Sequence, residues 1–495
     1  MSAGFTSRWG LMFAMLGMAV GTGNIWRFPR ILAKNGGGSF LVPWLIFLLM
    51  WSIPLILAEF SLGRGMRNGP LGAITRLIGP RFAWMGAWIT FTATAIMFYY
   101  AVVAGWTLRY FLASVTGELA PASVSDTYYT TFFQDFIDSP WPLVLHGVAM
   151  TLAVGVIYYG VHAIQRVSSV LLPSLVVLVA ILALRAATLP GAAAGLEFMF
   201  TVDWHQLGNH TIWLEALTQN AWDTGAGWGL ITTYAIYMRR TDDNTLNSFM
   251  LGFGNNAVSL LAGIAVIGTI FSIDPGARER IVGAGNEGLT FIWIPQLFER
   301  MPVGWLFMIV FFAALFMAAW SSLIALVELA TRGLQDLGVR RQPALVTVGM
   351  VGFLAGVPSA ISIDFLHNQD WVWGLALILS GLFFALAIIR HGVSTFRERW
   401  VNVEYNDFFI GKWWEVIIAV LIPVQAVALL MWWFWQTFPA TGTSWQRLVI
   451  WLAPIHTENT GTALAQWAIV LGGFLLLNRW LARRVAETPP VPAPD

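Results

Sequence analysis

The stretches GMAVGTGNIWRFP (residues 17–29) and QNAWDTGAGWG (residues 219–229) each place glycines beside polar or charged residues in the middle of a long apolar segment. A helix that unwinds at such glycines frees backbone N–H and C=O groups. The membrane interior tolerates these groups only where they line a cavity or bind a ligand. The N-terminal ends of half-helices carry the positive end of the helix dipole and attract an anion, and the freed carbonyl oxygens suit a cation. The alternative is a pair of intact helices that are kinked by packing glycines.

The rest of the chain has the composition of a membrane protein. Of its 495 residues, 57% are hydrophobic and 11% are charged, whereas soluble domains carry about 25% charged residues. The net charge of +1 argues against a nucleic-acid partner. The absence of cysteine excludes disulfides, thiolate nucleophiles and cysteine-bound metals. Because neither a G-x-S-x-G string nor a P-loop occurs, we do not expect an enzyme.

Twelve apolar segments are long enough to span a bilayer, which takes about 20 residues. They lie near 9–33, 39–66, 82–113, 141–159, 163–185, 210–239, 244–273, 302–333, 342–358, 367–391, 413–438 and 462–484. The first segment is not a cleaved signal peptide, because it is too long and carries Asn24, Arg27 and Arg30. We therefore expect an all-α polytopic membrane protein with twelve transmembrane helices.

The charges of the loops predict the orientation. Lys and Arg concentrate in the loops that lie inside if the N-terminus is cytoplasmic, whereas the 115–140 loop has four acids and no Lys or Arg. This pattern predicts a multi-pass protein of the cell (inner) membrane with both termini in the cytoplasm. The interrupted spans are the first and the sixth, which favours two five-span halves, 9–185 and 210–391, related as an inverted repeat. Spans 11 and 12 follow at 413–485, and the Pro-rich segment 486–495 is predicted to be a disordered cytoplasmic tail.

The chain resembles the neurotransmitter:sodium symporter family over roughly residues 5–485. The motifs that carry the resemblance are AVGTGNIWRFP (19–29), NGGGSFLVPW (35–44), IPLILAEFSLGR (53–64), YYAVVAGWTLRYF (99–111), GLEFMF (195–200), GAGWGLITTYAIY (225–237) and SSLIALVE (321–328). The resemblance implies a LeuT-type fold, in which ten helices form a 5+5 inverted repeat with helices 1 and 6 broken and two helices are added. It also implies cation-coupled uptake of an amino acid or amine by alternating access. The chain looks most like prokaryotic sodium-dependent amino-acid transporters.

The resemblance implies two sodium sites. The first would use the carbonyl of Ala19 and the side chains of Asn24, Asp223 and Asn255, which are hard oxygen ligands for a hard cation. The second would use the carbonyls of Gly17 and Val20 with the hydroxyl of Ser321. This second site usually has a pair of hydroxyls, and Trp320 stands at the position before Ser321. We therefore expect a weak or differently shaped second site.

For the substrate, the resemblance implies a carboxylate held by the first break and an amino group held by the second. The carboxylate would be bound by the amides of Gly21, Thr22 and Gly23 and by the hydroxyl of Tyr100. The amino group would meet carbonyls of Trp222, Asp223 and Gly225. The side-chain pocket would consist of Ile96, Trp222, Gly225, Trp228, Ser321 and Ala325. Because this pocket is almost wholly apolar with aromatic walls, we expect a neutral, apolar or aromatic amino acid.

Asp223 is an acid in the middle of a span, which costs about 2.5–3.5 kcal/mol on insertion scales and is a functional hypothesis by default. Chloride-dependent relatives bind the anion at positions that are Trp44, Gln219, Asp223, Asn255 and Ser259 in this chain. Asp223 would supply the fixed negative charge and Trp44 lacks the usual tyrosine hydroxyl, so no chloride is expected. A direct carboxylate ligand leaves sodium, lithium, potassium and a proton open as the cation. The alternative is that Asp223 pairs structurally with a neighbouring polar group.

Two further sets of residues match the outer side of the family's transport path. Arg27 and Asp370 match its outer gate pair, and Tyr100 and Trp222 match its aromatic lid. The alternative for Arg27 is a pairing with some other acid. Glu59 is expected to accept hydrogen bonds from the freed amides of the broken sixth helix.

On the inner side, Tyr237 matches the family's inner tyrosine, and Arg8 with Asp336 is a candidate inner latch. The tryptophans of span 11 favour a lipid or subunit contact, which leaves a homodimer open. Two functional alternatives also stay open: an amino-acid-binding membrane sensor that does not transport, and a symporter of a non-amino-acid amine. Net accumulation against a gradient would separate a transporter from a sensor.

Overall fold

The computed structural model describes residues 4–120, 127–454 and 456–494, and within these ranges it contains helices and no β-strand. Ten helical segments of the described chain are long and apolar enough to cross a membrane. Eight of them contain α6 (Ala83–Thr116), α8 (Trp141–Tyr158), α9 (Val161–Ala187), α13 (Thr245–Ile273), α17 (Gly304–Asp336), α18 (Arg341–Ile361), α19 (Ile363–His391) and α24 (Thr460–Glu487). The other two join α3 (Gly38–Phe47) to α4 (Ile53–Met66) and α21 (Trp413–Val416) to α22 (Ile422–Gln436) through π-helical turns. All ten coincide with predicted spans to within several residues.

The two remaining predicted spans, the first and the sixth, are broken where the glycines predict. Helix α1 (Arg8–Ala19) ends at Val20, whose backbone is extended, and helical structure resumes at Gly23 before α2 (Phe28–Lys34). Helix α11 (His210–Asp223) is separated from α12 (Leu230–Ala235) by a turn. In this turn Gly225, Gly227 and Gly229 have φ values of 70°, 86° and 81°. Residues with a Cβ rarely adopt such positive φ values, so these glycines make the break possible.

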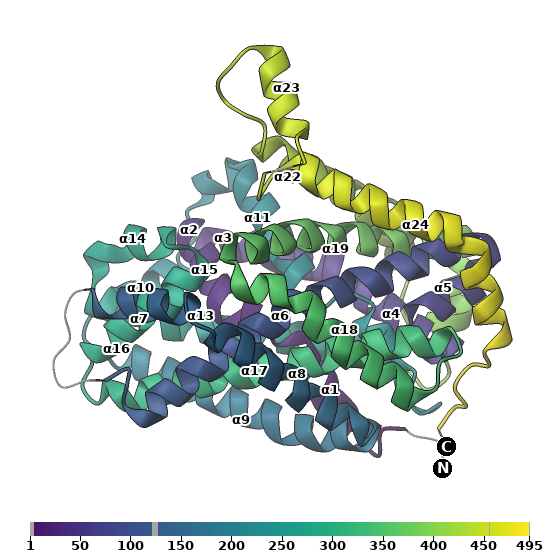
Figure 1. The fold of residues 1–495 in the computed structure, drawn as a ribbon, viewed down its shortest axis with the longest axis horizontal. Helices are drawn as coiled ribbons and strands as arrows, with labels where there is room; N and C mark the ends of the chain where they lie inside the picture. The colour runs from purple at the N-terminus through teal and green to yellow at the C-terminus, as the bar shows by residue number, and fades with distance from the viewer. Residues whose placement is uncertain (1–3, 121–126, 455, 495) are drawn as a thin grey trace.

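The intact helices enclose the broken ones. Helix α17 packs along α6 and α9, α13 packs along α9, and the broken helices lie between these and α4, with α1 against α9 and α12 against α4. Figure 1 shows this bundle with its long helices running roughly horizontally. The bundle therefore places both breaks in its interior, next to α6, α17 and α19.

The two ends of the bundle differ. Both chain termini lie at the same end, which we call the terminal face (Figure 1). The opposite end, which we call the loop face, carries α7 (Tyr128–Ile137), α10 (Ala192–Phe200), α14 (Arg278–Gly283), α15 (Gly285–Glu287) and α16 (Ile294–Glu299). The shorter helices α5 (Pro70–Ile78) and α20 (Val393–Phe396) follow α4 and α19 on the way to the terminal face.

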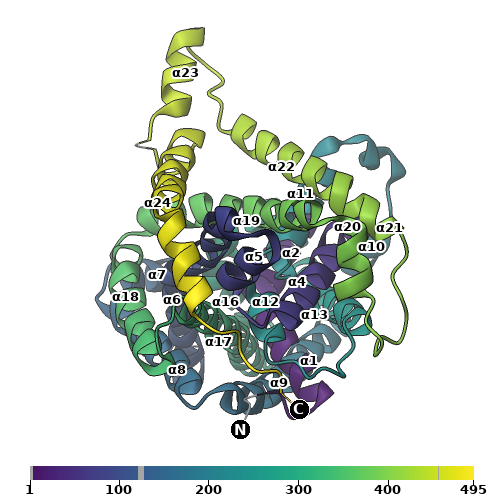
Figure 2. The same ribbon diagram turned by 90° about the vertical axis from the view of Figure 1, so that its right-hand side faces the viewer.

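The last two spans lie at the edge of the bundle. Figure 2 shows α22 and α24 diverging from each other, with α23 (Ser444–Leu452), which lies between them in the sequence, standing clear of the body above α24. Only 28% of the apolar window in each of these spans is buried, so most of their surface is available to lipid.

The segment after α24 differs from its prediction. Residues 488–494 lie along the terminal face, where the N–H of Val491 donates to the carbonyl of Arg67 at 3.0 Å. The prediction of a disordered tail is therefore wrong for these residues. The reason is that four prolines within residues 489–494 restrict the chain to extended conformations before it docks.

Candidate functional site

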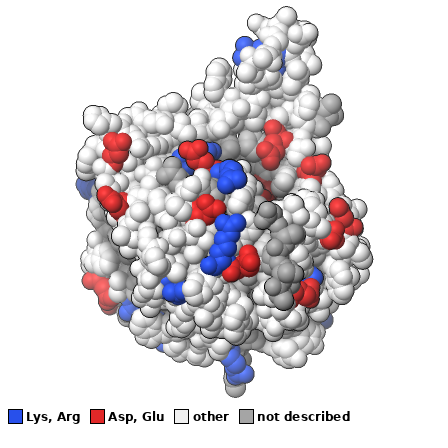
Figure 3. Space-filling model, turned by 90° about the vertical axis from the view of Figure 1, so that its left-hand side faces the viewer, with Lys and Arg blue, Asp and Glu red and all other residues white. Residues whose placement is uncertain are grey.

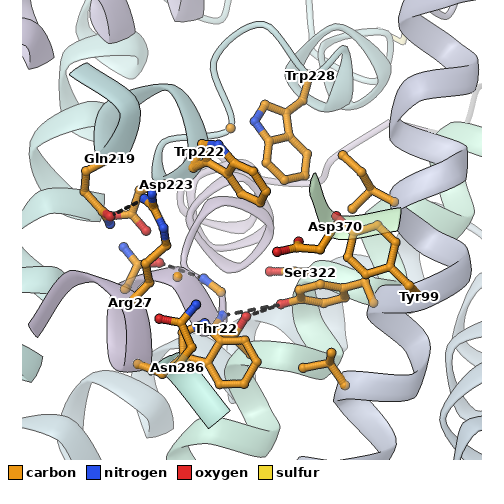
Figure 4. Close-up of a pocket in the computed structure, with 18 of the residues that line it drawn as sticks. Thr22, Arg27, Tyr99, Gln219, Trp222, Asp223, Trp228, Asn286, Ser322 and Asp370 are labelled. Carbon is orange, nitrogen blue, oxygen red and sulfur yellow. Dashed lines mark hydrogen bonds between the residues drawn. The ribbon is translucent and has the colours of Figure 1, made fainter. Parts of the chain in front are cut away.

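A cavity of about 510 Å³ lies where the two breaks face each other. It begins at residues 18, 19 and 21–24 of the first break and at Trp222, Asp223 and Gly225 of the second. It is also lined from α6, α17 and α19 and extends to α15 and to Glu458. The cavity thus connects the interior of the bundle with the loop face. Figure 4 shows part of its lining.

The first break lies against Tyr100 of α6. The Tyr100 hydroxyl accepts hydrogen bonds from the Thr22 amide at 3.3 Å and from the Thr22 hydroxyl at 3.4 Å. A Cβ on Gly21 would lie 3.1 Å from the Tyr100 oxygen and 2.9 Å from the Ser322 hydroxyl. Gly21, Thr22, Gly23 and Tyr100 all line the cavity, as the predicted carboxylate site requires. The Gly21 N–H donates to Asn24 Oδ1 at 2.8 Å, so that amide already has a partner.

The apolar part of the cavity is lined by Ile96, Trp222, Gly225 and Trp228 from the predicted pocket. Figure 4 shows both indole rings on the same side of the cavity. Trp222 fits against Gly374 of α19, where any Cβ would overlap the indole ring. The indole N–H of Trp228 donates to the Ala221 carbonyl at 3.2 Å, which ties this ring to the end of α11.

The prediction is wrong for two residues of α17. Ser322 and Leu326 line the cavity, whereas Ser321 and Ala325 do not. Successive residues of an α-helix point about 100° apart. The residues that line the cavity each follow the predicted residue by one position, so Ser321 and Ala325 point away from it. The Ser321 hydroxyl instead donates to the Ala318 carbonyl at 3.0 Å.

The same displacement changes the second predicted sodium site. Ser321 lies next to Gly17, with 3.8 Å between its Cβ and the position a Cβ would take on Gly17. The Ser322 hydroxyl donates to the carbonyl of Met18 at 3.1 Å. The adjacent hydroxyls beside the end of α1 are thus Ser321 and Ser322. Trp320 is not part of this group, because its ring stacks on Phe316 with centroids 6.0 Å apart. The reason given for a weak second site, the indole beside Ser321, is therefore wrong.

Asp223 lies in the polar network predicted for the first sodium site. Its side chain is 3% exposed, and its Oδ2 accepts a hydrogen bond from the Ser259 hydroxyl at 2.8 Å. Asn24 Nδ2 donates to that same hydroxyl at 2.8 Å and to Asn255 Oδ1 at 3.0 Å. The second carboxylate oxygen, Oδ1, has no hydrogen-bond partner among the described residues. This oxygen faces the first break, where a Cβ on Gly23 would lie 2.9 Å from it.

These oxygens fit a small hard cation. Asp223 contributes a buried negative charge with a free oxygen, and Asn24 and Asn255 bring amide groups into contact with the same network. A buried carboxylate oxygen without a hydrogen bond is costly unless a cation or proton satisfies it. The Ala19 residue at the end of α1 also lines the cavity, as the predicted ligand set requires.

The predicted outer gate pair is not joined in this structure. Arg27 and Asp370 both line the cavity, but no ion pair within 4.0 Å links them among the described residues. Arg27 instead donates to Gln219 Oε1 at 2.6 Å, and its guanidinium lies 5.5 Å from the Trp222 ring centroid. Figure 4 shows Arg27 beside Gln219 and Asp223, with Asp370 on the other side of the cavity. The path from the cavity to the loop face is therefore not closed by this pair.

Charged side chains surround the mouth of the cavity, and Figure 3 shows acidic and basic residues side by side near the middle of the loop face. Arg30 donates to Asn286 at 2.7 Å, and His367 of α19 lies 3.7 Å from Glu287 of α15. Burial alone would raise the pKa of Glu287, but the contact with His367 and the charge of Arg30 outweigh burial and lower this pKa. Asn286 was not predicted from the sequence, because a single amide side chain in a helix as short as α15 carries no pattern of its own.

Glu59 holds the second break, as predicted. It is fully buried in α4, and its carboxylate accepts from the Gly227 N–H at 2.7 Å and from the Thr232 N–H at 3.1 Å. The Thr232 hydroxyl donates to it as well, at 3.0 Å. The prediction that Glu59 satisfies freed amides of the broken sixth helix is thus confirmed. These bonds fix the direction in which α12 leaves the break.

The path toward the terminal face is filled. The Tyr237 hydroxyl donates to Glu328 at 2.7 Å, and Arg341 forms a bidentate pair with that same carboxylate at 2.8 and 2.9 Å. Phe5 packs against this tyrosine with ring centroids 6.3 Å apart. The pairing of Glu328 with Arg341 was not predictable from the sequence, because helix spacing alone does not bring α17 and α18 together.

The candidate inner latch of Arg8 and Asp336 is wrong. Arg8 lies 3.7 Å from Asp407, and both side chains are exposed. Asp336 is fully buried and accepts hydrogen bonds from the amides of Gly69 and Gly72 at 3.1 and 2.9 Å. Asp336 therefore holds the start of α5 instead of pairing with the N-terminal segment.

Comparison with known proteins identifies the family. The profile described as the Sodium:neurotransmitter symporter family matches residues 3–139 and 133–482. An uncharacterized sodium-dependent transporter of Methanocaldococcus jannaschii is 30% identical over 443 residues, covering 86% of this chain and 89% of that protein. The uncharacterized sodium-dependent transporter YhdH of Bacillus subtilis is 33% identical over 451 residues, covering 86% and 96%.

A solved structure agrees with this match. The crystal structure of MhsT in complex with L-phenylalanine superimposes with a TM-score of 0.74 at 28% identity, covering 86% of this chain and 99% of that one. The helical fold and the resemblance predicted from the motifs are confirmed. The chain therefore belongs to the Sodium:neurotransmitter symporter family of sodium-coupled membrane symporters and has its LeuT-type fold.

Proposed function

We propose that this protein uses a sodium gradient to import a neutral, apolar or aromatic amino acid by alternating access, without chloride. The observation that carries the proposal is the buried Asp223 carboxylate, which has one free oxygen next to the Asn24–Asn255–Ser259 network. A transport site needs a cation-binding group and a substrate-binding group in one cavity. The two breaks supply both within about 510 Å³.

Sodium is the proposed cation. The first site would be formed by Ala19, Asn24, Asp223 and Asn255. The second would be formed by Gly17, Val20 and the adjacent hydroxyls of Ser321 and Ser322. The contact of Ser322 with the Met18 carbonyl and the closeness of Ser321 to Gly17 support the second site. Both sets consist of oxygen donors, which suit a hard monovalent ion.

Chloride independence follows from charge. A cation in a buried site needs a compensating negative charge, which a mobile anion or a fixed carboxylate can supply. Asp223 is such a fixed carboxylate and is 3% exposed. The Trp44 side chain offers no hydroxyl to an anion and packs on Phe28 with ring centroids 4.6 Å apart. We therefore expect the same transport rate in chloride and in gluconate.

The substrate class follows from the cavity lining. The amides of the first break and the Tyr100 hydroxyl would receive a carboxylate, and carbonyls of the second break would receive an ammonium group. The wall formed by Ile96, Trp222, Trp228 and Leu326 carries no ionisable group, so the substrate side chain would be apolar or aromatic. MhsT, which is similar in fold, was crystallised with L-phenylalanine, and this supports an aromatic amino acid.

The terminal face would be cytoplasmic and the loop face outside, in the inner cell membrane, because the Arg-rich loops favour this orientation. In this orientation, the described state is open toward the outside, with Arg27 and Asp370 apart, and closed inward at Tyr237. Substrate binding would bring the outer pair and the Trp222 lid together before the inner side opens.

Uptake by proteoliposomes tests the proposal. A panel of radiolabelled neutral amino acids would be offered with an inward sodium gradient, in chloride and in gluconate. The proposal predicts accumulation of an apolar or aromatic member in both salts. Binding without accumulation would favour the sensor, and uptake of an amine alone would favour the other alternative. Accumulation that needs chloride would contradict the role of Asp223.

A further inference from the structure

The segment that follows α24 makes specific contacts with the terminal face. Its sequence is TPPVPAP at residues 488–494. Within residues 489–492, Val491 has the only backbone N–H, and this N–H donates to the carbonyl of Arg67 at 3.0 Å. Arg76 donates to the carbonyls of Val485 and Thr488, which fixes the start of the segment. Because prolines hold the chain extended beforehand, docking loses little conformational entropy.

Arg67 links this segment to the broken sixth span. Its guanidinium donates to the carbonyls of Ile236 and Met238 at 2.7 and 2.6 Å, just beyond the end of α12. Its own carbonyl accepts the hydrogen bond from Val491. The side chain is largely buried at 9% exposure, so both sets of bonds lie away from bulk water. One residue therefore joins the segment to the inner half of the sixth span.

The other end of the segment reaches the first span. Pro494 is buried and packs so closely on Gly4 that a Cβ on Gly4 would overlap its ring. Gly4 precedes Phe5, whose N–H donates to the carbonyl of Tyr237 at 3.2 Å. The Phe5 ring meets the rings of Tyr234 and Tyr237, each with centroids 6.3 Å away. Pro494 thus packs on Gly4, and Gly4 is the neighbour of Phe5, whose ring fills the path to the terminal face.

We propose that residues 488–494 form a strap that holds the terminal face closed by bridging the inner ends of the first and sixth spans. Opening toward this face must part Phe5 from Tyr234 and Tyr237. Since the strap contacts both sides of that parting, its bonds to Arg67 and Gly4 break when the face opens. Releasing the strap lowers the barrier to opening. The proposal rests on alternating access, but on neither the substrate nor the chloride assignment.

Hydrogen–deuterium exchange of the purified protein in lipid nanodiscs tests the strap without any substrate. The full chain would be compared with a chain that ends at Glu487. The deletion removes the hydrogen bond from Val491 to Arg67, the one from Arg76 to Thr488 and the packing of a buried proline. This loss predicts about tenfold faster exchange in peptides from α1 and from residues 230–238. Peptides from α7 on the loop face serve as the internal control and should exchange at the same rate in both chains.

A point variant separates the strap from general damage. Gly4→Ala places a methyl group where Pro494 packs and should speed exchange in the full chain by about the same factor as the deletion. In the chain that ends at Glu487, Gly4→Ala should have a clearly smaller effect, because the Pro494 ring is gone and only the Tyr237 carbonyl oxygen, 3.3 Å from the new Cβ, stays close. Val491→Pro, which removes the one donor to Arg67, should give a smaller increase of about threefold.

Equal exchange of α1 in the full and shortened chains would overturn the proposal. It would also be overturned if Gly4→Ala changed the exchange rates equally in the full and shortened chains, because the effect of the new methyl group would then not come from contact with Pro494. Uptake assays on the same variants keep the proposals distinct, because a failed chloride or substrate prediction leaves these exchange rates unchanged.

Discussion

Replacing Asp223 by asparagine keeps the shape of the side chain and removes its charge. Two unit charges about 4 Å apart interact by about 4 kcal/mol at an effective dielectric constant of 20. Truncating one partner of a buried charged pair costs about 2–5 kcal/mol in measured cases. Because 1.4 kcal/mol is a factor of ten, Asp223→Asn should weaken the apparent sodium affinity by about two to three orders of magnitude. Asp223 is only 3% exposed, so the cost of losing its charge is that of a buried charged pair and not the smaller cost of a surface pair.

The assay is sodium-dependent uptake into proteoliposomes over a range of sodium concentrations, in chloride and in gluconate. Asp364→Asn is the matched control, because it makes the same chemical change at an exposed position at the start of α19. Asp223→Ser should regain part of its activity when chloride replaces gluconate, since a mobile anion can then supply the missing charge. Unchanged sodium affinity in Asp223→Asn, with the control also unchanged, would refute the direct role of this carboxylate.

Three further outcomes follow from the contacts of the site. Gly374→Ala should push the indole of Trp222 into the cavity and weaken substrate affinity at least about tenfold in a binding assay. Restored affinity in the double variant with Trp222→Phe would verify the clash. Unchanged affinity in the single variant would contradict it. Glu59→Gln replaces the carboxylate that accepts three hydrogen bonds at the second break and should destabilise the protein by about 2–4 kcal/mol. The loss would be measured as a lower melting temperature, and an unchanged melting temperature would argue against this role of Glu59. Because the pKa of Glu287 is lowered in the fold, its contact with His367 stabilises the protein above the ordinary pKa of a glutamate and ceases to do so as the pH falls through the lowered value. Glu287→Gln should therefore melt below the parent at pH 7, and the two should converge in acid; a difference that persists in acid would count against this contact.

The breaks were predictable because their cause is local. At the second break Gly225, Gly227 and Gly229 have positive φ, which residues with a Cβ rarely adopt, and these glycines are recognisable in the sequence, as are Gly21 and Gly23 at the first break. The role of Glu59 was also predictable, since a buried acid must find donors and a broken helix offers free amides. These predictions depend on residue chemistry and on order along the chain.

The errors arose where rotation or packing between distant elements decides the contact. Ser321 and Ser322 are neighbours in sequence, yet only Ser322 lines the cavity, because helical rotation separates them by about 100°. The partners of Glu328 and Asp336 depend on how α17 packs against α18 and α5, which no local pattern encodes. The segment after α24 was misjudged because its proline content indicates an extended chain but not its contacts with Arg67 and Gly4.

The measurement that tests the central claim most directly is accumulation of a labelled apolar or aromatic amino acid in chloride-free proteoliposomes with an inward sodium gradient. The claim predicts accumulation above the external concentration that collapses when the sodium gradient is dissipated and is lost in Asp223→Asn at low sodium. Uptake that appears only when chloride is added, or that is unaffected by the loss of the sodium gradient, would contradict it.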